Sequence, residues 1–278
     1  MSVTTTPAGP DLKAKHRAMW ASGDYADVAE RVIPSLGPVL VQASGVRAGQ
    51  RVLDVAAGSG NAAVPAARLG ASVVASDLTP ELLDRGRADA EAAGVSLEWR
   101  TADAEALPFD DASFDVVMSC VGVMFAPHHQ ASADELVRVV RPGGTIGLLS
   151  WTPEGFIGQL FATMKSYVAA PPPGAQPPPL WGREDHVRAL LGDRVEDVVA
   201  TKQTLRVDGF GSGEDFRDYF KTQYGPTLAA YKFNADDPER ISALDADLAA
   251  LGERHLRPGD DGRPSMEWEY LLLTCRVR

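Results

Sequence analysis

Three aspartates recur along the first half of the chain, each separated from the next by about one strand and one helix. Asp54 lies in an apolar run, Asp77 ends the next run, and Asp103 follows the third. Since the carboxyl ends of parallel strands meet at one edge of a sheet, we expect the three carboxylates to lie at that edge together. Each aspartate taken singly is typical of a helix cap or a solvated loop. Together they favour a nucleoside cofactor, whose ribose hydroxyls Asp77 would bind.

A glycine-rich turn follows Asp54. The segment Gly58-Ser-Gly60-Asn-Ala-Ala63 matches the pattern G-x-G-x-x-A and lies between a predicted strand and a predicted helix. The glycines alone fit either a plain strand-to-helix turn or a dinucleotide site. Asp54 would repel a pyrophosphate there, but it would attract the positive sulfonium and amino groups of S-adenosylmethionine. The turn therefore favours S-adenosylmethionine over NAD.

The hydrophobic pattern predicts the elements that position these residues. Apolar runs predict strands at 51–55, 72–76, 96–100, 114–119 and 145–151, and their alternation with helical patterns predicts a parallel α/β sheet. Thr79-Pro80-Glu81 indicates the start of a helix, and Gly94 indicates its end. A second helix at 132–140 is closed by Arg141-Pro-Gly-Gly144, a turn through which we expect neither helix nor strand to continue.

The segments outside this alternation predict a cover for the site. Residues 12–44 indicate two helical pieces that break around Gly23 and Pro34, so we expect residues 1–44 to form an N-terminal lid with Trp20 and Tyr25 over the cofactor. A proline-rich connector at 171–179 precedes a predicted helix at 183–191, a strand at 195–207, helices at 213–224 and 235–253, and a strand at 266–277. We expect residues 45–278 to form one domain, with substrate-cover insertions at about 153–182 and 209–262.

Composition limits the partners. Asp and Glu number 38 against 27 Lys and Arg, a net charge of -11 that disfavours nucleic acid. Cys120 and Cys275 have no companion at ligand spacing, so we expect neither a disulfide nor a metal site. No apolar run reaches the roughly 20 residues of a membrane span, and residues 1–10 lack a signal-peptide pattern. These features predict a soluble, cytoplasmic protein, with its oligomeric state open and a homodimer as one option.

An ordered set of motifs carries a family resemblance. The segments are Val52-Leu-Asp-Val-Ala-Ala-Gly-Ser-Gly60, Ala75-Ser-Asp-Leu78, Ala102-Asp-Ala-Glu-Ala-Leu-Pro-Phe109, Phe114-Asp-Val-Val117 and Leu136-Val-Arg-Val-Val-Arg-Pro-Gly-Gly144. Together they resemble the successive motifs of class I S-adenosylmethionine-dependent methyltransferases, in the branch that includes the ubiquinone and menaquinone biosynthesis methyltransferases. The resemblance covers residues 45–151. It implies a Rossmann-like three-layer sandwich with a seven-stranded, mostly parallel sheet and an antiparallel last strand.

The same resemblance implies where the cofactor lies. Its methionine part would run along the turn and the end of strand four, at Asp54, Ala56, Gly58, Gly60 and either Ser119 or Cys120. Asp77 would hold the ribose, and Leu78 would lie against the adenine. Asp103, with Ala104 beside it, would accept from the adenine amino group. The chain departs from the family at Ala56, where glycine is usual, and we expect the added methyl to be tolerated.

Methyl transfer from a sulfonium is an in-line displacement, so orientation and exclusion of water can supply much of the rate without a catalytic base. If a base exists, His128 is the first candidate, with His129 beside it, because both follow strand four; exposed loop histidines or a helix start are the alternative. Weaker candidates for substrate contact are His16, Tyr25, Tyr219, Tyr224 and His255. Several aromatic residues could line an acceptor pocket or simply fill the core: Trp151, Phe156, Phe161, Trp181, Phe216, Tyr219 and Phe220.

The segment Ser119-Cys-Val-Gly-Val-Met-Phe125 lacks the Pro-Pro-aromatic signature of enzymes of this fold that methylate nucleic-acid amino groups. We therefore expect methyl transfer to a hydroxyl or carbon of a small apolar or aromatic molecule. Two other classes stay open. One is a relative that binds S-adenosylmethionine without methylating, as a scaffold or a cyclase. The other is an NAD-dependent oxidoreductase, which Asp54 and Asp103 disfavour.

Overall fold

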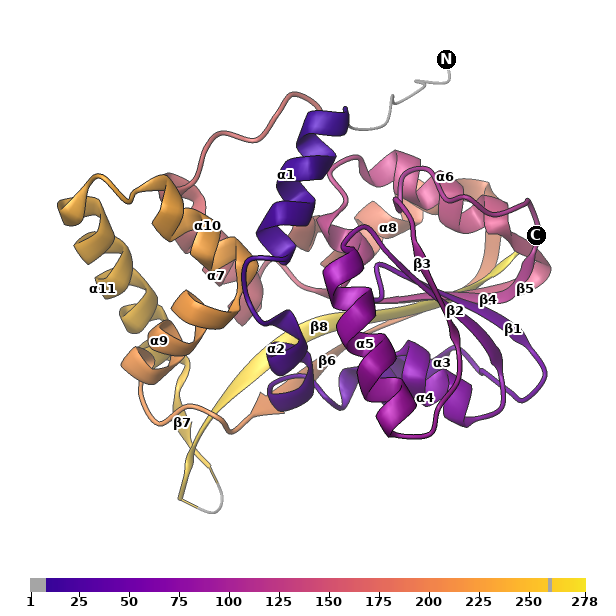
Figure 1. Cartoon of the computed structure of the whole chain (residues 1–278), viewed down its shortest axis with the longest axis horizontal. Coiled ribbons are helices and arrows are strands. Elements are labelled where there is room, and N and C mark those ends of the chain that lie inside the picture. Colours follow the sequence, from indigo (N-terminus) through magenta and orange to yellow (C-terminus); the bar gives the residue numbers. More distant parts are fainter. Residues whose placement is uncertain (1–8, 260–261) are drawn as a thin grey trace.

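The structure is a computed structural model that describes residues 9–259 and 262–278, and its centre is a twisted sheet (Figure 1). The strands are β1 (Arg51–Val55), β2 (Ser72–Asp77), β3 (Glu98–Thr101), β4 (Phe114–Cys120), β5 (Val140–Trp151), β6 (Val195–Val207), β7 (Arg257–Pro258) and β8 (Pro264–Val277). Their order is β3-β2-β1-β4-β5-β8-β6, and the short β7 pairs with β8. β1 to β5 pair in parallel, whereas β8 runs antiparallel to β5 and β6. The predicted mostly parallel sheet with an antiparallel last strand is confirmed.

Helices cover both faces of the sheet and complete a three-layer sandwich. α3 (Leu36–Ala43), α4 (Ala63–Arg68) and α5 (Pro80–Ala92) pack on one face, and α6 (His129–Val139) and α8 (Glu184–Leu191) pack on the other (Figure 1). α5 begins as predicted, with Pro80 in its first turn, and Gly94 follows its end in the left-handed conformation. The strands between these layers are mostly buried on both faces, as expected for a parallel sheet.

The predicted stop at residues 141–144 is wrong, because β5 already begins at Val140. Val140 pairs with Phe114, and regular pairing with β4 resumes only at Thr145, opposite Val116. A shift of register absorbs the intervening residues, with Gly143 at a φ of 77°. Residues 141–144 therefore do turn the backbone, but they form a bulge within β5 instead of a break before it.

The N-terminal segment forms three helices instead of the predicted two: α1 (Pro10–Trp20), α2 (Tyr25–Arg31) and α3. The chain breaks where predicted, around Gly23 and Pro34, and the Asp24 side chain caps α2 by accepting from the amide of Asp27. Residues 1–8 lie outside the described residues. They are part of the predicted lid and of the segment in which no signal peptide was expected. The division into a lid at 1–44 and a domain at 45–278 stays a prediction.

The segments after β5 build a helical cover beyond the carboxyl edge of the sheet. It consists of α7 (Phe156–Met164), α9 (Gly213–Gln223), α10 (Gly225–Phe233) and α11 (Pro238–His255). α9 and α11 match the predicted helices to within a few residues, whereas α7 and α10 were not predicted. In Figure 1, α1 stands between the sheet and this cover; α1 contacts α10, and α2 contacts both α5 and α9. Residues 260–261 of the predicted insertion lie outside the described residues.

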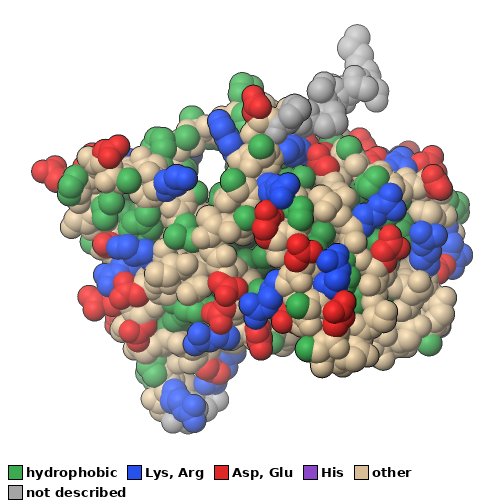
Figure 2. All heavy atoms as spheres, viewed as in Figure 1, with side chains coloured by type: hydrophobic (Ala, Val, Ile, Leu, Met, Phe, Trp, Pro, Cys, Tyr) green, Lys and Arg blue, Asp and Glu red, His purple; other side chains and the backbone are tan. Residues whose placement is uncertain are grey.

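Acidic and basic side chains are interspersed on the face seen in Figure 2, and neither charge dominates a large area of it. No helix in residues 9–259 and 262–278 is both long and apolar enough to cross a membrane. Within the same residues, no group of three or more His, Cys, Asp or Glu side chains could hold a metal ion. Cys120 and Cys275 are free thiols.

Candidate functional site

A cavity of about 840 Å³, counting the space at its mouth, opens at the carboxyl edge of the sheet. Its walls are residues 56–59 after β1, 77–79 at the end of β2, 102–104 after β3 and 120–122 at the end of β4. β1 lies between β2 and β4, so the chain crosses to the other side of the sheet at this point. Such a switch point leaves a crevice that binds ligands in open α/β sheets.

Most of the predicted cofactor-binding residues meet in this cavity. Its lining includes Tyr25, Ala56, Gly58, Asp77, Leu78, Asp103, Ala104 and Cys120. Four predicted site residues are absent from the lining: Asp54, Gly60, Ser119 and His128. The first three lie in or behind the walls, and His128 is held elsewhere by Glu105, as described below.

The turn after β1 places several residues in the left-handed region of backbone conformation. Gly58 has a φ of 56° and Ala56 has a φ of 54°. Glycine adopts this region freely, whereas a residue with a side chain pays about 1–2 kcal/mol. The conformation therefore explains why glycine is usual at position 56. The structure makes room for the extra methyl at Gly122, where an added Cβ would collide with Ala56.

Gly60 allows the turn to pack closely against the Trp99 ring. Its φ is 90°, and a Cβ there would lie 2.7 Å from the Trp99 ring of β3. Gly86 of α5 meets the same ring, at 2.6 Å from its hypothetical Cβ. The Trp99 ring thus fills the space below the turn, and both glycines are needed for that close packing.

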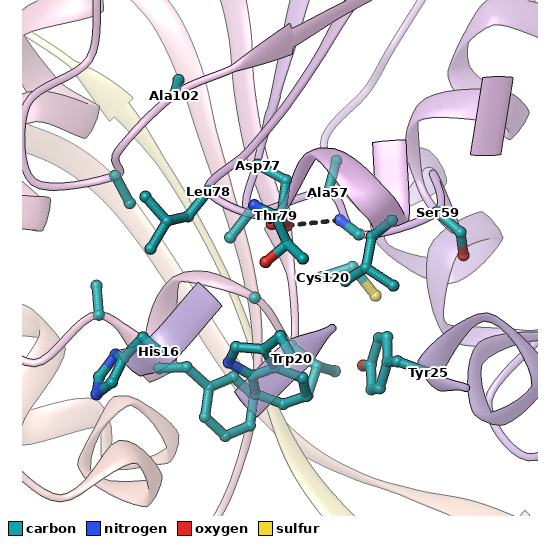
Figure 3. Close-up of a pocket in the computed structure, with 18 of the residues that line it drawn as sticks. His16, Trp20, Tyr25, Ala57, Ser59, Asp77, Leu78, Thr79, Ala102 and Cys120 are labelled. Carbon is teal, nitrogen blue, oxygen red and sulfur yellow. Dashed lines mark hydrogen bonds between the residues drawn. The ribbon is translucent and has the colours of Figure 1, made fainter. Parts of the chain in front are cut away.

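Asp77 connects the two turns that form the cavity floor. Its Oδ2 accepts a hydrogen bond from the amide of Gly58 at 2.8 Å, and its Oδ1 accepts from the amide of Thr79 at 2.8 Å. Figure 3 shows this carboxylate opposite Trp20, at the middle of the cavity. Burial raises the pKa of Asp77, although the two amides oppose the shift. Each oxygen keeps a second lone pair that can accept from a ligand hydroxyl.

Asp54 is buried behind the turn. Its side chain is 1% exposed, and neither carboxylate oxygen has a hydrogen-bond partner among the described residues. Burial raises the pKa of Asp54 to about 8, and the nearby Asp77 adds to the shift. An unpartnered buried carboxylate is costly when it is charged. A cation bound in front of the turn would lower that cost.

Lys13 of α1 ties the lid to the segment after β3. Its Nζ lies 2.8 Å from Oδ1 of Asp103 and 2.8 Å from Oε2 of Glu105, whose side chain is fully buried. The amide of Glu105 also donates to Oδ1 of Asp103 at 2.9 Å. Both donors use the same oxygen, so Oδ2 of Asp103 has no hydrogen bond of its own within the described chain. That oxygen can accept from a ligand.

His128 is part of this same cluster. Its backbone amide donates to Oε1 of Glu105 at 2.9 Å, and its Nδ1 lies 3.2 Å from Oε2. On its other side, the ring lies close to Gly174 of the proline-rich connector. His129 points elsewhere, to His186 of α8 at 2.9 Å, and burial lowers the pKa of His129 to about 3. Neither histidine reaches the cavity.

Aromatic side chains close the cavity on the side of the lid. The Trp20 ring packs edge-on against Tyr25 at 5.2 Å and against Phe125 at 4.7 Å between centroids. In Figure 3, Trp20 lies below Asp77, with His16 at one end of the cavity and Tyr25 at the other. Lys13, His16 and Trp20 lie three and four residues apart on one face of α1. That spacing is visible in the sequence and could have revealed Lys13.

The sequence left open whether Ser119 or Cys120 lines the site at the end of β4, and the structure places the two residues differently. Cys120 lines the cavity. The hydroxyl of Ser119 donates to the carbonyl of Val55 at 2.6 Å and accepts from the amide of Val123 at 2.8 Å. Ser119 therefore braces the end of β4 against β1 and leaves the cavity wall to its neighbour.

Comparisons with known proteins agree with this geometry. Residues 53–148 match the methyltransferase domain family. An uncharacterized protein of Mycobacterium tuberculosis is 53% identical over 94% of this chain and 93% of its own length. A demethylmenaquinone methyltransferase of Clavibacter sepedonicus is 43% identical over 36% of this chain and 40% of its own length.

Solved structures share the fold. A putative methyltransferase from Bacillus halodurans superposes with a TM-score of 0.55 at 23% identity, over 87% of this chain and 98% of that one. The cyclase SpnF superposes with a TM-score of 0.52 at 18% identity, over 88% of this chain and 80% of that one. Residues 53–148 therefore form a methyltransferase domain, and the chain resembles the class I S-adenosylmethionine-dependent methyltransferases in these motifs and in its fold.

S-adenosylmethionine is the cofactor of this methyltransferase family, and the cavity fits its chemistry. The orphaned carboxylate of Asp54 suits a ligand that carries positive charge but no phosphate. The lone pairs of Asp77 suit ribose hydroxyls, and the open oxygen of Asp103 suits an amino group. The left-handed turn at Gly58 lets a ligand approach the backbone.

The first prediction concerns Asp77. We expect Asp77→Ala to weaken binding of S-adenosylmethionine at least tenfold, because it removes the predicted ribose acceptor and leaves the amides of Gly58 and Thr79 without this partner. Isothermal titration calorimetry measures the affinity. The matched control is Asp84→Ala, which removes an exposed carboxylate of α5 that pairs with Arg87. Equal affinities for the two variants would contradict the assignment of Asp77.

The second prediction concerns the pH dependence of stability through Asp54. Its pKa is about 8 in the folded protein against an ordinary value of 3.8, so unfolding releases a proton between those values and stability falls as pH rises through that range. Asp54→Asn removes this loss. We expect the variant to gain in Tm over the parent as pH rises from about 5 to 8, and to bind S-adenosylmethionine more weakly. A Tm difference that is independent of pH would contradict the buried, protonated carboxyl.

The third prediction concerns the Lys13 ion pairs. We expect Lys13→Met to speed dissociation of S-adenosylmethionine about tenfold, because it releases α1 from Asp103 and leaves the buried Glu105 short of a cation. Stopped-flow measurements of cofactor release test this. The control Arg17→Met, on the same helix, breaks an ion pair with Glu81 in which both side chains are about half exposed. It should have little effect. Similar dissociation rates for both variants would show that the Lys13 ion pairs do not slow release of the cofactor.

Proposed function

We propose that the protein transfers the methyl group of S-adenosylmethionine to a hydroxyl or carbon of a small apolar or aromatic molecule. The observation that carries this is the apolar part of the cavity lining, which includes Trp20, Tyr25, Val121 and Phe125. Such a surface favours an apolar acceptor over a charged one. The absence of a continuous basic patch on the face in Figure 2 further supports a small-molecule acceptor.

We further propose how the chain holds the cofactor. Asp77 binds the ribose, and Asp103, with Leu78 and Ala104, binds the adenine. Ala56, Gly58 and Cys120 lie along the methionine part. Asp54 is protonated in the empty cavity, and the bound cation would favour its ionised form, which then acts through its charge from behind the turn. Burial raises the pKa of Tyr25, which keeps its hydroxyl protonated as a donor for the methionine carboxylate. Gly60 and Ser119 shape the walls without contact.

The chemistry then depends on position and charge. When bound, S-adenosylmethionine supplies an electrophilic methyl carbon, and the sulfur keeps the electron pair of the broken bond. The aromatic lid holds the acceptor in line with that carbon and excludes water. Asp54 and Asp77 stabilise the bound cation, and the backbone at 120–122 sets the distance to the acceptor. The acceptor contributes the electron pair of the new bond.

No ready base stands at the Tyr25 end among the described residues. Burial raises the pKa of the Cys120 thiol and of Tyr25, so both stay protonated. His16 lines the opposite end, beside Asp103 and Glu105. We therefore propose that the acceptor gives its proton to bulk water before it enters the site, as an acidic hydroxyl or an enol can, and binds as the anion that attacks the methyl carbon. His128, the predicted base, is better placed to position Glu105 and, through Lys13, the lid.

A second candidate is a relative that binds the cofactor without methylating. The same lack of a base, and the structural likeness to the cyclase SpnF, favour keeping it. In such a protein the bound cofactor would complete the walls of a chamber in which another molecule rearranges. Formation of S-adenosylhomocysteine separates the two candidates, because only methyl transfer produces it.

The fourth prediction tests transfer with a panel of small phenols. We expect S-adenosylhomocysteine to form faster with 4-nitrophenol than with phenol at neutral pH, because phenol ionises only near pH 10 and the site supplies no base. The pH of half-maximal rate should move with the acidity of the phenol. Chromatography of the products measures both. Asp77→Ala serves as the negative control. Conversion of an acceptor without S-adenosylhomocysteine would favour the second candidate, and a pH profile shared by all phenols would indicate a base on the protein.

A further inference from the structure

Asp54 and Asp77 form a pair of buried carboxyls at the cofactor cavity. They lie on the neighbouring strands β1 and β2, and the two residues are 1% and 8% exposed. Lys13 is the only lysine or arginine in the described lining of the cavity, and its Nζ is already held by Asp103 and Glu105. This part of the described chain therefore supplies no cation that neutralises the pair.

The two carboxyls differ in their hydrogen bonds. Asp77 accepts from the amides of Gly58 and Thr79. Neither oxygen of Asp54 accepts a hydrogen bond within the described residues, although the amide of Ala63 partly offsets the effect of its burial on its pKa. Hydrogen bonds to a carboxylate favour its charged form, and two neighbouring carboxyls in a buried site do not readily ionise together. Asp77 therefore keeps the negative charge, and Asp54 keeps the proton.

The charge of Asp54 is felt in the wall of the cavity. Burial raises the pKa of the Cys120 thiol of β4, and the charge of Asp54 adds to that shift. Cys120 and Asp77 both line the cavity, and in Figure 3 both lie across it from Trp20. Among the described residues, Tyr25 of α2 is a further titratable group near this pair, and its raised pKa keeps its hydroxyl protonated. Because Asp54 lies behind this wall, a positive charge bound in front of it favours the ionised carboxylate, whereas a neutral group does not.

Methyl transfer changes the charge of the cofactor at its sulfur. S-adenosylmethionine carries a positive sulfonium, and the product S-adenosylhomocysteine has a neutral thioether in its place. The amino and carboxylate groups of the two molecules are the same. The sulfur is therefore the point at which a charged side chain can distinguish the substrate from the product.

We propose that Asp54 responds to the charge on the sulfur: it gives its proton to bulk water when S-adenosylmethionine binds, and it regains a proton from water once methyl transfer leaves the neutral thioether. This rests on the proposed function, in which the methionine part lies along Ala56, Gly58 and Cys120. The ionised Asp54 attracts the sulfonium, and the neutral thioether gains nothing from it. Asp54 thereby sets the preference of the site for the substrate over the product.

The proposal predicts a pH dependence that belongs to the substrate alone. The pKa of Asp54 is about 8 in the protein without a ligand, and a bound cation lowers it. The affinity for S-adenosylmethionine therefore rises with pH up to about 8 and then levels off, since the coupling between the proton and the ligand is reciprocal. Both ligands carry the same amino group, so the ratio of their affinities removes most of its titration and isolates that of Asp54.

Isothermal titration calorimetry of both ligands into the full-length protein, without an acceptor, tests this. The titrations are made at pH 6, 7 and 8, each in two buffers of different ionisation enthalpy, so that the released protons are counted. We expect the preference for S-adenosylmethionine over S-adenosylhomocysteine to rise about tenfold from pH 6 to pH 8, because loss of up to one proton changes affinity by at most tenfold per pH unit. At pH 7 the substrate should release more than about half a proton beyond what the product releases.

The decisive variant is Asp54→Asn, which keeps the size of the protonated acid and cannot ionise. Its preference between the two ligands should be independent of pH. It should bind S-adenosylmethionine about tenfold more weakly than the parent at pH 8 and nearly as well at pH 6, where Asp54 of the parent is mostly protonated. The matched control is Asp84→Asn, an exposed carboxylate of α5, which should keep the pH dependence of the parent.

Three results would overturn the proposal: the same preference at pH 6 and pH 8, equal proton release by both ligands, or a pH dependence that persists in Asp54→Asn and so belongs to Asp77. If that variant does not fold, the proton count of the parent decides alone. Failure of both ligands to bind would overturn the placement of the cofactor together with this proposal. If the preference changes with pH as expected but no acceptor is methylated, the role of Asp54 is supported and the proposed methyl transfer is wrong.

Discussion

The carboxylate of Asp77 is the contact on which the site depends. It bonds the amide of Gly58 on one side and that of Thr79 on the other, so the turn after β1 and the start of α5 are held at a fixed spacing. Both amides are early donors of turns that lead into helices and have no partner within a strand. A single side chain therefore satisfies the backbone of two connections, and it lines the cavity with lone pairs to spare. If Asp77 binds the ribose as proposed, folding and binding use the same atoms.

A buried acid makes a similar link on the adenine side. Glu105 has no exposed side-chain surface, and Lys13 supplies the cation that a buried carboxylate requires. Because Lys13 stands on the N-terminal helix, its ion pair with Glu105 holds α1 against the segment after β3. The same nitrogen contacts Asp103, so α1 also fixes the orientation of the predicted adenine acceptor. This coupling makes α1 part of the cofactor site instead of a separate appendage.

The sequence predicted those features whose causes are local. Alternating apolar runs and the Thr79-Pro80 start signal predicted the strands and α5, because periodicity and capping act within a few residues. The sequence placed His128 correctly after β4, but the direction of its ring depends on Glu105, 23 residues away in the chain. Lys13 was not predicted as a site residue, since only the packing of α1 brings it to Asp103 and Glu105, about 90 residues away in the chain. Long-range packing leaves no periodic signal in one sequence.

Val121 shows how a strained backbone positions the cavity wall at the end of β4. It is a β-branched residue at a φ of 55°, a conformation that costs free energy and persists only where the surroundings impose it. Its amide donates to the carbonyl of Leu149 on β5 at 2.8 Å, and the adjoining Gly122 is fixed against Ala56. The chain is thus held on both sides and forced to turn at this residue. The turn places Val121 in the wall of the cavity, so backbone strain at the end of β4 fixes this part of the wall.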